Sequence, residues 1–436
     1  MSTSDNSVNP HFLGHMKSTG AAYETAAIED IVTVNGIKLL AKGSQIDATT
    51  AGRLLEHKLM KPLENSVRVE GGVDATAVRE AAEKLSSKHG LLRSICADGR
   101  TPSIGEALAG LKLTPQLHTL LTVYVQQQPG RLEHAVGVAM LVLALARRLL
   151  PGESEQQRAL ATAGLLHDLG ELYIDPALLS TQQRLDPPQW RRIASHPVVG
   201  YRVLLVVSGG GRLIAEAVRD HHERLDGFGY PRGIRGDALS VPGQLLAASE
   251  WLMAMLDSGL APVSRFSAAT KLVQGEFSPA VVELLGQLAK EHEELLGAIA
   301  EQDAGIEDAS RRLAQLERIM DHYRATKPWL DECIAGARAP LRRVIEGALQ
   351  RFLRVQTAFA STGLARAEPQ ALLRELAAAG DMRMWLEVTS ILRELVWRMR
   401  EIERTSLLRA GLLSSADQQV MQDVVTRLSS GEPIPA

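Results

Sequence analysis

Most of this chain is predicted to be helical, because from Asp74 onward leucine- and alanine-rich segments with apolar residues three and four positions apart follow one another. Proline and glycine separate these segments, for example at Pro129-Gly130, Pro151-Gly152 and Pro187-Pro188. The chain has 436 residues, 45% of them hydrophobic, which is enough for two or three domains with real cores. The pattern predicts a mainly α fold beyond residue 73.

The N-terminal 73 residues follow another pattern. Residues 1–22 are rich in Ser, Thr, Asn and Gly without an apolar period, so we expect a mobile tail there. Residues 23–73 are expected to form a small α+β module, with Asn35-Gly36 as the type I′ turn of a hairpin. The expected strands and helix of this module are Ile31–Val34, Ile37–Ala41, Asp47–Leu59 and Ser66–Val69.

The C-terminal third contains two heptad-like seams. Apolar residues alternate three and four positions apart from Leu285 to Tyr323, and again from Trp385 to Ile402. As one helix, the first seam would be about 60 Å long. The seams could be the inner faces of a bundle within the chain or a coiled coil between two chains, and we expect a homodimer. The sequence thus divides into a connector at 74–129, a central helical domain at 130–288 and a helical or coiled-coil region at 289–436.

Composition excludes several classes of function. The formal net charge of −3 gives no overall basic field, so a nucleic acid is not an expected partner. The apolar run Ala135–Ala146 is too short to cross a bilayer, so no membrane partner is expected either. Cys96 and Cys333 cannot build a disulfide framework, and the N-terminus does not resemble a signal peptide. We therefore expect a soluble, cytoplasmic protein.

A group of potential metal ligands lies in the central region. Five of the 12 histidines and two carboxylates gather there: His134, His167, Asp168, His196, His221, His222 and Glu250. Imidazole and carboxylate groups suit divalent metals of the Fe, Mn and Zn class. Asp168 directly follows His167, and an aspartate can bridge two cations about 3.5 to 4 Å apart that activate water for attack on a phosphate ester.

These residues belong to strings that resemble a known family. His167-Asp168-Leu169-Gly170, the spaced His196, and His221-His222-Glu223-Arg224 followed by residues 226–231 are similar to the HD-GYP family of bacterial cyclic di-GMP phosphodiesterases. The resemblance spans about 130–288, and Gly275–Val282 is similar to the end of that domain. It implies an all-helical domain with a binuclear, sometimes trinuclear, metal site. Members convert cyclic di-GMP to pGpG and, in some cases, to GMP.

The resemblance also implies roles for individual residues. One metal would be bound by His134, His167, Asp168 and Glu250, and the other by Asp168, His196, His221 and His222. The two divalent metal ions would be Fe or Mn. The residues that would shape the substrate pocket are Asp226, Gly227, Gly229, Tyr230 and Pro231. In related proteins, the loop that corresponds to Gly229-Tyr230-Pro231 is implicated in docking diguanylate cyclase domains.

Four positions depart from the family pattern. The family lysine after the His-Asp-x-Gly string is Glu171 here, and the last metal-binding aspartate is Glu250. The Arg-Pro-Tyr-Arg string has no clear counterpart within Asp257–Phe266, and Gly130 stands one turn before His134 where the family has glutamate. The metal ligands are therefore kept while the phosphate contacts are largely lost.

Glu171 is the departure that bears most on catalysis. Its charge would repel a phosphate unless the side chain turns outward or is compensated by Arg224 or Arg232. Replacing Glu171 by lysine is accordingly expected to strengthen binding or turnover of cyclic di-GMP. We expect Asp168, Glu171 and Arg224 to be the residues that act on the substrate.

Three functions follow as alternatives. The first is metal-dependent hydrolysis of cyclic di-GMP. The second is a catalytically weak receptor or adaptor that signals through protein contacts. The third is an HD-type hydrolase of another nucleotide, because Glu171 would suit a less anionic substrate.

Overall fold

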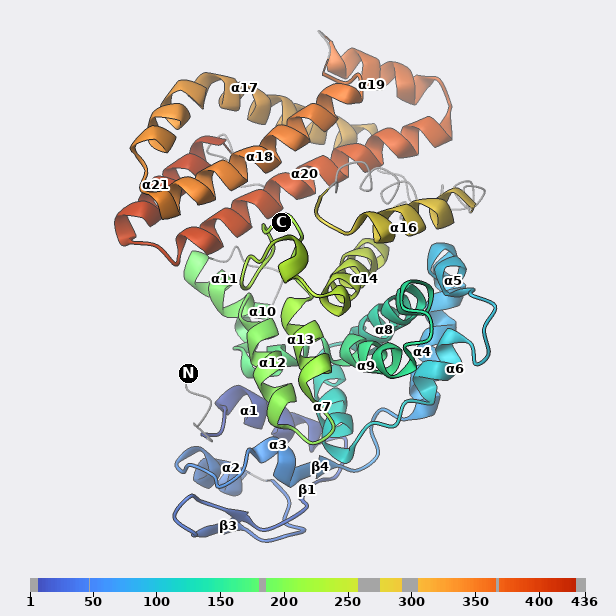
Figure 1. The fold of residues 1–436 in the computed structure, drawn as a ribbon, viewed down its shortest axis with the longest axis vertical. Coiled ribbons are helices and arrows are strands. Elements are labelled where there is room, and N and C mark those ends of the chain that lie inside the picture. The colour runs from blue at the N-terminus through green and yellow to red at the C-terminus, as the bar shows by residue number, and fades with distance from the viewer. Residues whose placement is uncertain are drawn as a thin grey trace. The chain divides into compact units, whose positions relative to one another are not determined.

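The computed structural model describes residues 7–46, 48–179, 186–257, 275–291, 305–365 and 368–428. The chain is mainly helical, as the sequence predicts, and divides into two compact units (Figure 1). The first unit comprises Met1–Ser180 and Arg192–Ala254, and the second Thr181–Arg191 and Met255–Ala436. The expected α+β module and helical connector both lie in the first unit.

The first unit contains all seven candidate metal ligands. Its helices are α1 (Pro10–Thr19), α2 (Ala48–Leu55), α3 (Leu63–Ser66), α4 (Ala75–Lys88), α5 (Gly90–Cys96), α6 (Ile104–Ala109), α7 (Pro115–Val125), α8 (Arg131–Leu149), α9 (Ser154–Leu166), α10 (Pro176–Leu179), α12 (His196–Val206), α13 (Arg212–Asp220) and most of α14 (Val241–Asp257). Two short 3-10 helices, η1 (Leu169–Tyr173) and η2 (Gly236–Ala238), lie between them.

The expected mobile tail is wrong for the described residues 7–22, because they include α1. The side chain of Asn9 accepts hydrogen bonds from the N–H groups of His11 and Phe12 and so caps this helix. Phe12, Leu13 and Met16 are buried, and the Phe12 ring stacks on Tyr173 with 5.2 Å between centroids. The apolar spacing of a single short helix was hidden by the polar composition around it.

The N-terminal strands form two small antiparallel pairs. Strand β1 (Thr25–Ala27) pairs with β4 (Val67–Val69), and β2 (Ile31–Val32) pairs with β3 (Lys38–Leu40). The second pair is the predicted hairpin. Its turn is not the expected two-residue type I′ turn, because Thr33 N–H donates to Ile37 O and Gly36 N–H donates to Thr33 O. The loop is therefore Val34-Asn35-Gly36, with the positive φ of +80° at its last residue.

Helix α8 is the centre of the first unit. The apolar run Ala135–Ala146 is buried all around, which is the pattern of a helix surrounded by other helices. Helix α9 packs very closely on it, since a Cβ atom at Gly164 would lie 2.6 Å from the Cα of Ala139. Among the described residues, every helix is too short or too polar to cross a bilayer.

The second unit is a bundle of long helices. Its helices are the short α11 (Pro187–Ile193), which ends two residues into the first unit, α16 (Pro279–Glu291), α17 (Ile306–Gly336), α18 (Ala339–Ser361), α19 (Pro369–Ala378), α20 (Met382–Ala410) and α21 (Ser415–Leu428). Helices α17, α18, α20 and α21 pack against one another (Figure 1). The string Gly275–Val282 lies in this unit, where Glu276 is buried and forms an ion pair with Arg398 of α20 at 2.5 Å.

The bundle buries most of the described residues of both heptad seams within the chain. Buried residues of the first seam include Leu313, Leu316 and Tyr323, whose ring lies 4.5 Å from that of Phe352. Buried residues of the second seam are Trp385, Leu392, Leu395, Met399 and Ile402. Burial of these side chains favours the intrachain bundle for the described residues, and the expected homodimer stays a prediction.

The single long helix expected from the first seam is wrong. Helix α17 begins after Gly305, whose φ of −53° and ψ of 158° are not helical, and residues 292–304 lie outside the described residues.

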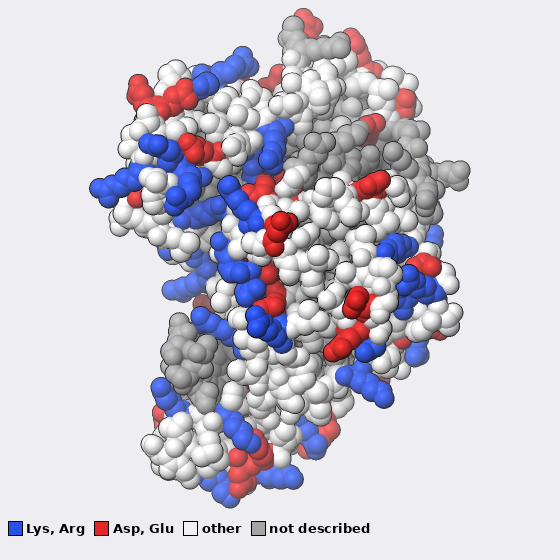
Figure 2. All heavy atoms as spheres, viewed as in Figure 1, with Lys and Arg blue, Asp and Glu red and all other residues white. Residues whose placement is uncertain are grey.

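Charged side chains of both signs are interspersed over the face drawn in Figure 2, in keeping with the small net charge.

Leu313→Ala and Leu316→Ala should each lower the free energy of unfolding by about 2 to 5 kcal/mol, because both side chains are fully buried in the bundle. Chemical denaturation would measure the loss. Leu412→Ala is the matched control, since Leu412 is 78% exposed. Unchanged stability together with a lower mass by light scattering would mean instead that the seam pairs two chains.

Candidate metal centre

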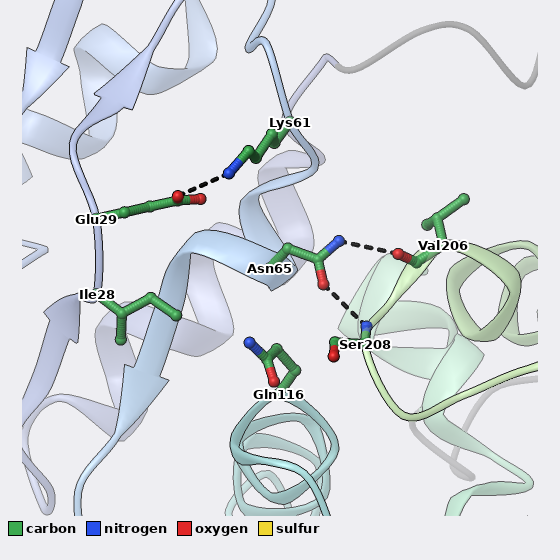
Figure 3. A pocket seen from close by; sticks show the side chains of 7 residues that line it. All are labelled: Ile28, Glu29, Lys61, Asn65, Gln116, Val206 and Ser208. Atoms are coloured by element: carbon green, nitrogen blue, oxygen red, sulfur yellow. Dashed lines mark hydrogen bonds and ion pairs between the residues drawn. The ribbon is translucent and has the colours of Figure 1, made fainter.

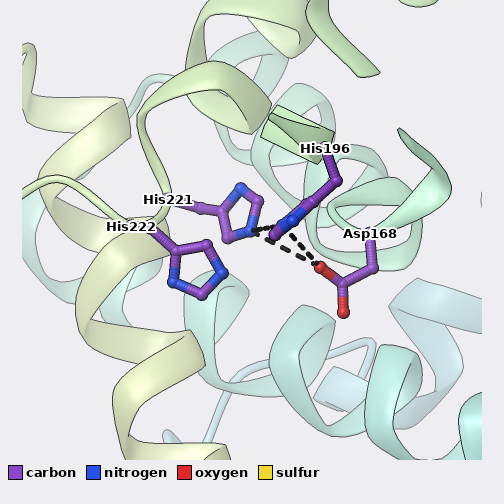
Figure 4. A group of neighbouring side chains, drawn as sticks. All are labelled: Asp168, His196, His221 and His222. Atoms are coloured by element: carbon purple, nitrogen blue, oxygen red, sulfur yellow. Dashed lines mark hydrogen bonds and ion pairs between the residues drawn. The ribbon is translucent and has the colours of Figure 1, made fainter. Parts of the chain in front are cut away.

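All seven candidate ligands meet in one place. His134 is in the first turn of α8, His167 follows the last residue of α9, and His196 begins α12. His221 and His222 follow α13, and Glu250 lies on α14. Helices far apart in the sequence therefore meet at the site: α8, α9, α12 and α13 contribute residues at their ends, and α14 contributes one from its side. Figure 4 shows four of these side chains, Asp168, His196, His221 and His222, pointing toward one another.

The ligand atoms form two groups. The first group is Asp168, His196, His221 and His222. The second group is His134, His167 and Glu250. Within each group, one ligand atom of each residue lies within 4.8 Å of those of all the other members. The carboxylate of Asp168 lies between them, with Oδ2 3.1 Å from His167 Nε2 and Oδ1 3.2 Å from His196 Nε2. This arrangement has the form that the resemblance implies for a bridging aspartate.

Backbone carbonyls fix the orientation of three imidazole rings. Nδ1 of His167, His196 and His221 lies 2.8, 2.8 and 2.5 Å from the carbonyl oxygen of the residue three positions earlier. A carbonyl can only accept, so each Nδ1 carries the proton and donates it. Nε2 is then left as the atom that faces the cluster, which is how metal-binding histidines are commonly held.

The inward-facing nitrogen atoms fit a divalent metal. Nε2 of His196 and Nε2 of His221 are only 3.1 Å apart, and neither carries a proton when its Nδ1 does. Nε2 of His167 is fully buried and makes no hydrogen bond of acceptable geometry, although carboxylate oxygens lie 3.1 and 3.3 Å away. A cation between these atoms would satisfy all of them. Five imidazoles and two carboxylates suit Fe, Mn or Zn.

The charges of the cluster are strongly coupled. Burial opposes protonation of His167, yet the carboxylates of Asp168 and Glu250 hold its pKa well above the ordinary value. Burial acts against ionisation of Asp168 as well, but the neighbouring histidines keep its pKa well below the usual range. The pKa of His222 is well below that of an ordinary histidine because the ring is buried beside His221 and His196. Protons and a metal ion therefore compete for the same ligand atoms.

Glu171 is compensated by an arginine that the sequence did not single out. Its Oε2 lies 2.8 Å from Nη2 of Arg131, and both side chains are largely buried. The outward orientation is therefore wrong, and so is compensation by Arg232, which pairs with Asp220 at 2.7 Å. Burial, and then the charge of Asp168, raises the pKa of Glu171, although Arg131 acts in the opposite direction.

Tyr124 and Arg131 are the site residues that sequence reasoning missed. The Tyr124 hydroxyl donates to Asp168 Oδ2 at 3.4 Å, and the Arg131 guanidinium lies 4.5 Å from the centroid of the Tyr124 ring. Arg131 stands three positions before His134 on the same helix, a spacing that places both on one face and could have revealed it. No sequence signal pointed to Tyr124.

Residues 223–234 form a loop that packs against the ligands. The buried carboxylate of Glu223 accepts hydrogen bonds from the N–H groups of Arg232, Gly233 and Ile234 at 2.6, 3.1 and 3.3 Å. The Tyr230 ring stacks on His222 with 4.6 Å between centroids, and Tyr230 N–H donates to His222 O. The loop therefore holds the imidazole ring of His222, a candidate metal ligand, in place.

The expected pocket residues all lie in this loop. Asp226 Oδ1 accepts from Phe228 N–H, Gly227 has a φ of +74°, and Pro231 follows Tyr230. A Cβ atom at Gly229 would lie 2.4 Å from the backbone N of Arg224, so only glycine fits. Arg224, expected to act on the substrate, is buried and donates to the Glu223 carbonyl. The catalytic role of Arg224 and the substrate contacts of the loop stay predictions.

Gly170 allows η1 and α12 to pack closely. Helix α9 ends at Leu166, and a Cβ atom at Gly170 would lie 2.0 Å from the carbonyl oxygen of His196. The missing side chain lets η1 lie directly against the first turn of α12, which brings Asp168 close to His196.

A separate hollow of about 470 Å³ lies elsewhere in the first unit (Figure 3). It is lined by Ile28, Glu29, Lys61, Asn65, Gln116, Val206 and Ser208. Asn65 donates to Val206 O at 2.9 Å and accepts from Ser208 N–H at 3.0 Å, which connects the N-terminal module to the last residue of α12 and the segment after it. None of these residues belongs to either ligand group.

Comparison with known proteins gives a consistent result. Residues 118–275 match the family model described as an HD domain. A cyclic di-GMP phosphodiesterase of Pseudomonas aeruginosa is 35% identical over 118 residues, which cover 27% of this chain and 28% of the relative. A 3′3′-cGAMP-specific phosphodiesterase of Vibrio cholerae is 27% identical over 204 residues, or 45% of this chain and 44% of the relative. This chain thus spans less than half the length of these two relatives.

Asp168→Ala should remove more bound metal than His196→Ala. The two oxygens of Asp168 face both ligand groups, whereas His196 belongs to one. Elemental analysis of anaerobically purified, metal-supplemented protein would give the metal-to-protein ratio. His118→Ala, in α7, is the control that should leave the ratio unchanged. Wild-type protein without transition metal under these conditions would contradict the assignment.

Metal affinity should rise with pH, and should keep rising above the ordinary histidine pKa of about 6.5. The reason is the raised pKa of His167, whose proton must leave before Nε2 can bind a cation. Calorimetric metal titrations in buffers of different ionisation enthalpy would count the protons released. Affinity that does not vary with pH, with no proton release, would exclude these histidines as ligands.

Proposed function

We propose that this chain, which carries an HD domain, is a metal-dependent phosphodiesterase that hydrolyses cyclic di-GMP to pGpG or GMP. The observation that carries the proposal is the convergence of seven ligands in two groups with the carboxylate of Asp168 between them. The names of the relatives from Pseudomonas aeruginosa and Vibrio cholerae support a cyclic dinucleotide as the substrate.

The candidate ligands would hold two divalent cations. His134, His167, Asp168 and Glu250 would hold one divalent cation, and Asp168, His196, His221 and His222 the other, with Fe or Mn as the proposed metals. Such a pair supplies a nucleophilic water at neutral pH and neutralises charge on the phosphate. The three backbone-held histidines keep the cluster rigid, so little reorganisation is needed when the substrate binds.

The bond change is a simple hydrolysis. Water adds to one phosphorus atom of the cyclic dinucleotide, the bond from that phosphorus to the ribose oxygen breaks, and the leaving oxygen takes up a proton. The product is a linear dinucleotide. A second hydrolysis of the same kind would give the mononucleotides.

The second candidate substrate is 3′3′-cGAMP. Relatives from Vibrio cholerae are named for this compound, one of them 34% identical over 123 residues. Both cyclic dinucleotides have the same ring of two riboses and two phosphates and differ at a base. The metal centre acts on the shared ring, so the choice between the two must come from contacts with the base.

The adaptor hypothesis remains the rival from another class. A diguanylate cyclase domain docked at Gly229-Tyr230-Pro231 would reach the metal centre through the stacking of Tyr230 on His222. In this hypothesis the centre binds the nucleotide but turns it over slowly. A homodimer is part of neither proposal, and light scattering would measure the oligomeric state.

Anaerobically purified, metal-loaded protein should convert cyclic di-GMP to linear products, separated by chromatography. A parallel reaction with 3′3′-cGAMP would rank the two substrates. Asp168→Asn and chelated wild-type protein are the controls and should lose activity by at least a thousandfold, or about 4 kcal/mol of the barrier, because the bridge is lost. Tight binding of cyclic di-GMP without any product would contradict the enzyme and favour the adaptor.

A further inference from the structure

A largely buried guanidinium lies beside the metal centre. Arg131 is the first residue of α8, three positions before the candidate ligand His134, and its side chain is 10% exposed. A positive charge at the start of a helix opposes the helix dipole, so helix stability does not explain an arginine at this position. The burial of its charge calls for another account.

Two contacts of Arg131 and two contacts of its neighbours connect this side chain to the metal centre. Its Nη2 pairs with Oε2 of Glu171 at 2.8 Å, and its guanidinium lies 4.5 Å from the centroid of the Tyr124 ring. The Tyr124 hydroxyl in turn donates to Asp168 at 3.4 Å. The N–H of Glu171 donates to the backbone carbonyl of Asp168 at 2.9 Å, so the carboxylate that holds Arg131 is fixed to the same residue.

Other arginines near the site are committed to neighbouring groups. Arg219 and Arg232 both pair with Asp220, at 2.9 and 2.7 Å, and Arg224 donates to the carbonyl of Glu223. Arg131 instead pairs with a residue of η1, which begins directly after Asp168. A guanidinium has five N–H donors in a fork that matches phosphate oxygens. The N-terminus of the 19-residue helix α8 adds a positive potential at the same point.

We propose that Arg131 donates to a phosphate oxygen of the substrate and that Glu171 is the positioning residue that holds its guanidinium. The proposal rests on the function proposed above, because it needs a phosphodiester ligand. Glu171 then acts as half of a neutral pair and not as an isolated repulsive charge. The expectation for Glu171→Lys reverses, since lysine would bring two cations together and displace Arg131.

The test measures the affinity of the full, metal-loaded chain for a hydrolysis-resistant phosphorothioate analogue of cyclic di-GMP. Arg131→Gln should weaken binding about tenfold to a hundredfold, as loss of a charged hydrogen bond does. Arg131→Lys, which keeps the charge but not the fork, should fall between Arg131→Gln and wild type. Metal content should be the same in all variants, because no proposed ligand is changed.

A double variant separates a lost contact from an exposed charge. Arg131→Gln alone leaves Glu171 without its partner, and that carboxylate would repel the phosphate even if Arg131 never touched it. Arg131→Gln with Glu171→Gln removes both charges. It should remain at least tenfold weaker than wild type if Arg131 contacts phosphate. A return to wild-type affinity would overturn the proposal.

Arg147→Gln is the matched control. Arg147 lies on the same helix, is similarly buried, and pairs with Asp98 at 3.1 Å. It should lower stability without changing affinity for the analogue. Equal losses of affinity in Arg147→Gln and Arg131→Gln would attribute the effect to destabilisation and overturn the proposal.

The outcomes distinguish this proposal from the proposed function. Wild-type protein that neither binds nor hydrolyses a cyclic dinucleotide contradicts the proposed function and the role of Arg131 with it. Wild-type protein that does both, beside an Arg131→Gln variant of equal affinity, overturns the role of Arg131 alone. If Arg131→Gln does not fold, the affinity of Arg131→Lys decides, and a wild-type value again overturns the proposal.

Discussion

The carboxylate of Asp168 is the group on which the arrangement of the first unit depends. Its two oxygens face different sets of imidazoles, at 3.1 Å from His167 and 3.2 Å from His196. Burying a carboxylate is costly unless positive charge or hydrogen-bond donors surround it. Here those partners come from the ends of α9, α12 and α13, so these helices must end beside Asp168. The close packing at Gly164 and Gly170 makes that possible, because any side chain there would separate the helices.

The helical fold and the ligand set could be predicted from the sequence, each for a physical reason. Helical spacing of apolar residues persists over long segments, and five histidines with two carboxylates in one region are improbable as independent surface residues. Helix α1 and the interruption of the first heptad seam at Gly305 were not predicted from the sequence, because both depend on short-range details. Asn9 caps α1 through its side chain, and Gly305, just before α17, has a non-helical conformation although the heptad pattern continues through it. A periodic pattern does not encode either event.

The charges around Glu171 could not be predicted because pairing depends on three-dimensional proximity. Arg224 and Arg232 were the nearest arginines in the motif, but the loop turns them toward Glu223 and Asp220. Arg131 is forty positions from Glu171 in the sequence and reaches it because α8 and η1 both approach Asp168. From the sequence alone, Glu171 means only that the positive charge of the family lysine is lost. The structure instead places a cation and an anion together, with the cation supplied by a different helix.

The same cluster links metal binding to the stability of the first unit. Without metal, the carboxylates of Asp168 and Glu250 raise the pKa of His167, while burial lowers the pKa of His222. One ring therefore tends to be charged and another neutral, and the inward Nε2 atoms of His196 and His221 face each other at 3.1 Å. A proton on one ring relieves the close approach of only one pair of inward-facing ligand atoms. Two divalent cations, held by the two ligand groups that share Asp168, would relieve the close approach of all of them. Because ligands that bind only the folded state stabilise it, metal binding would also hold together the helix ends that form the site.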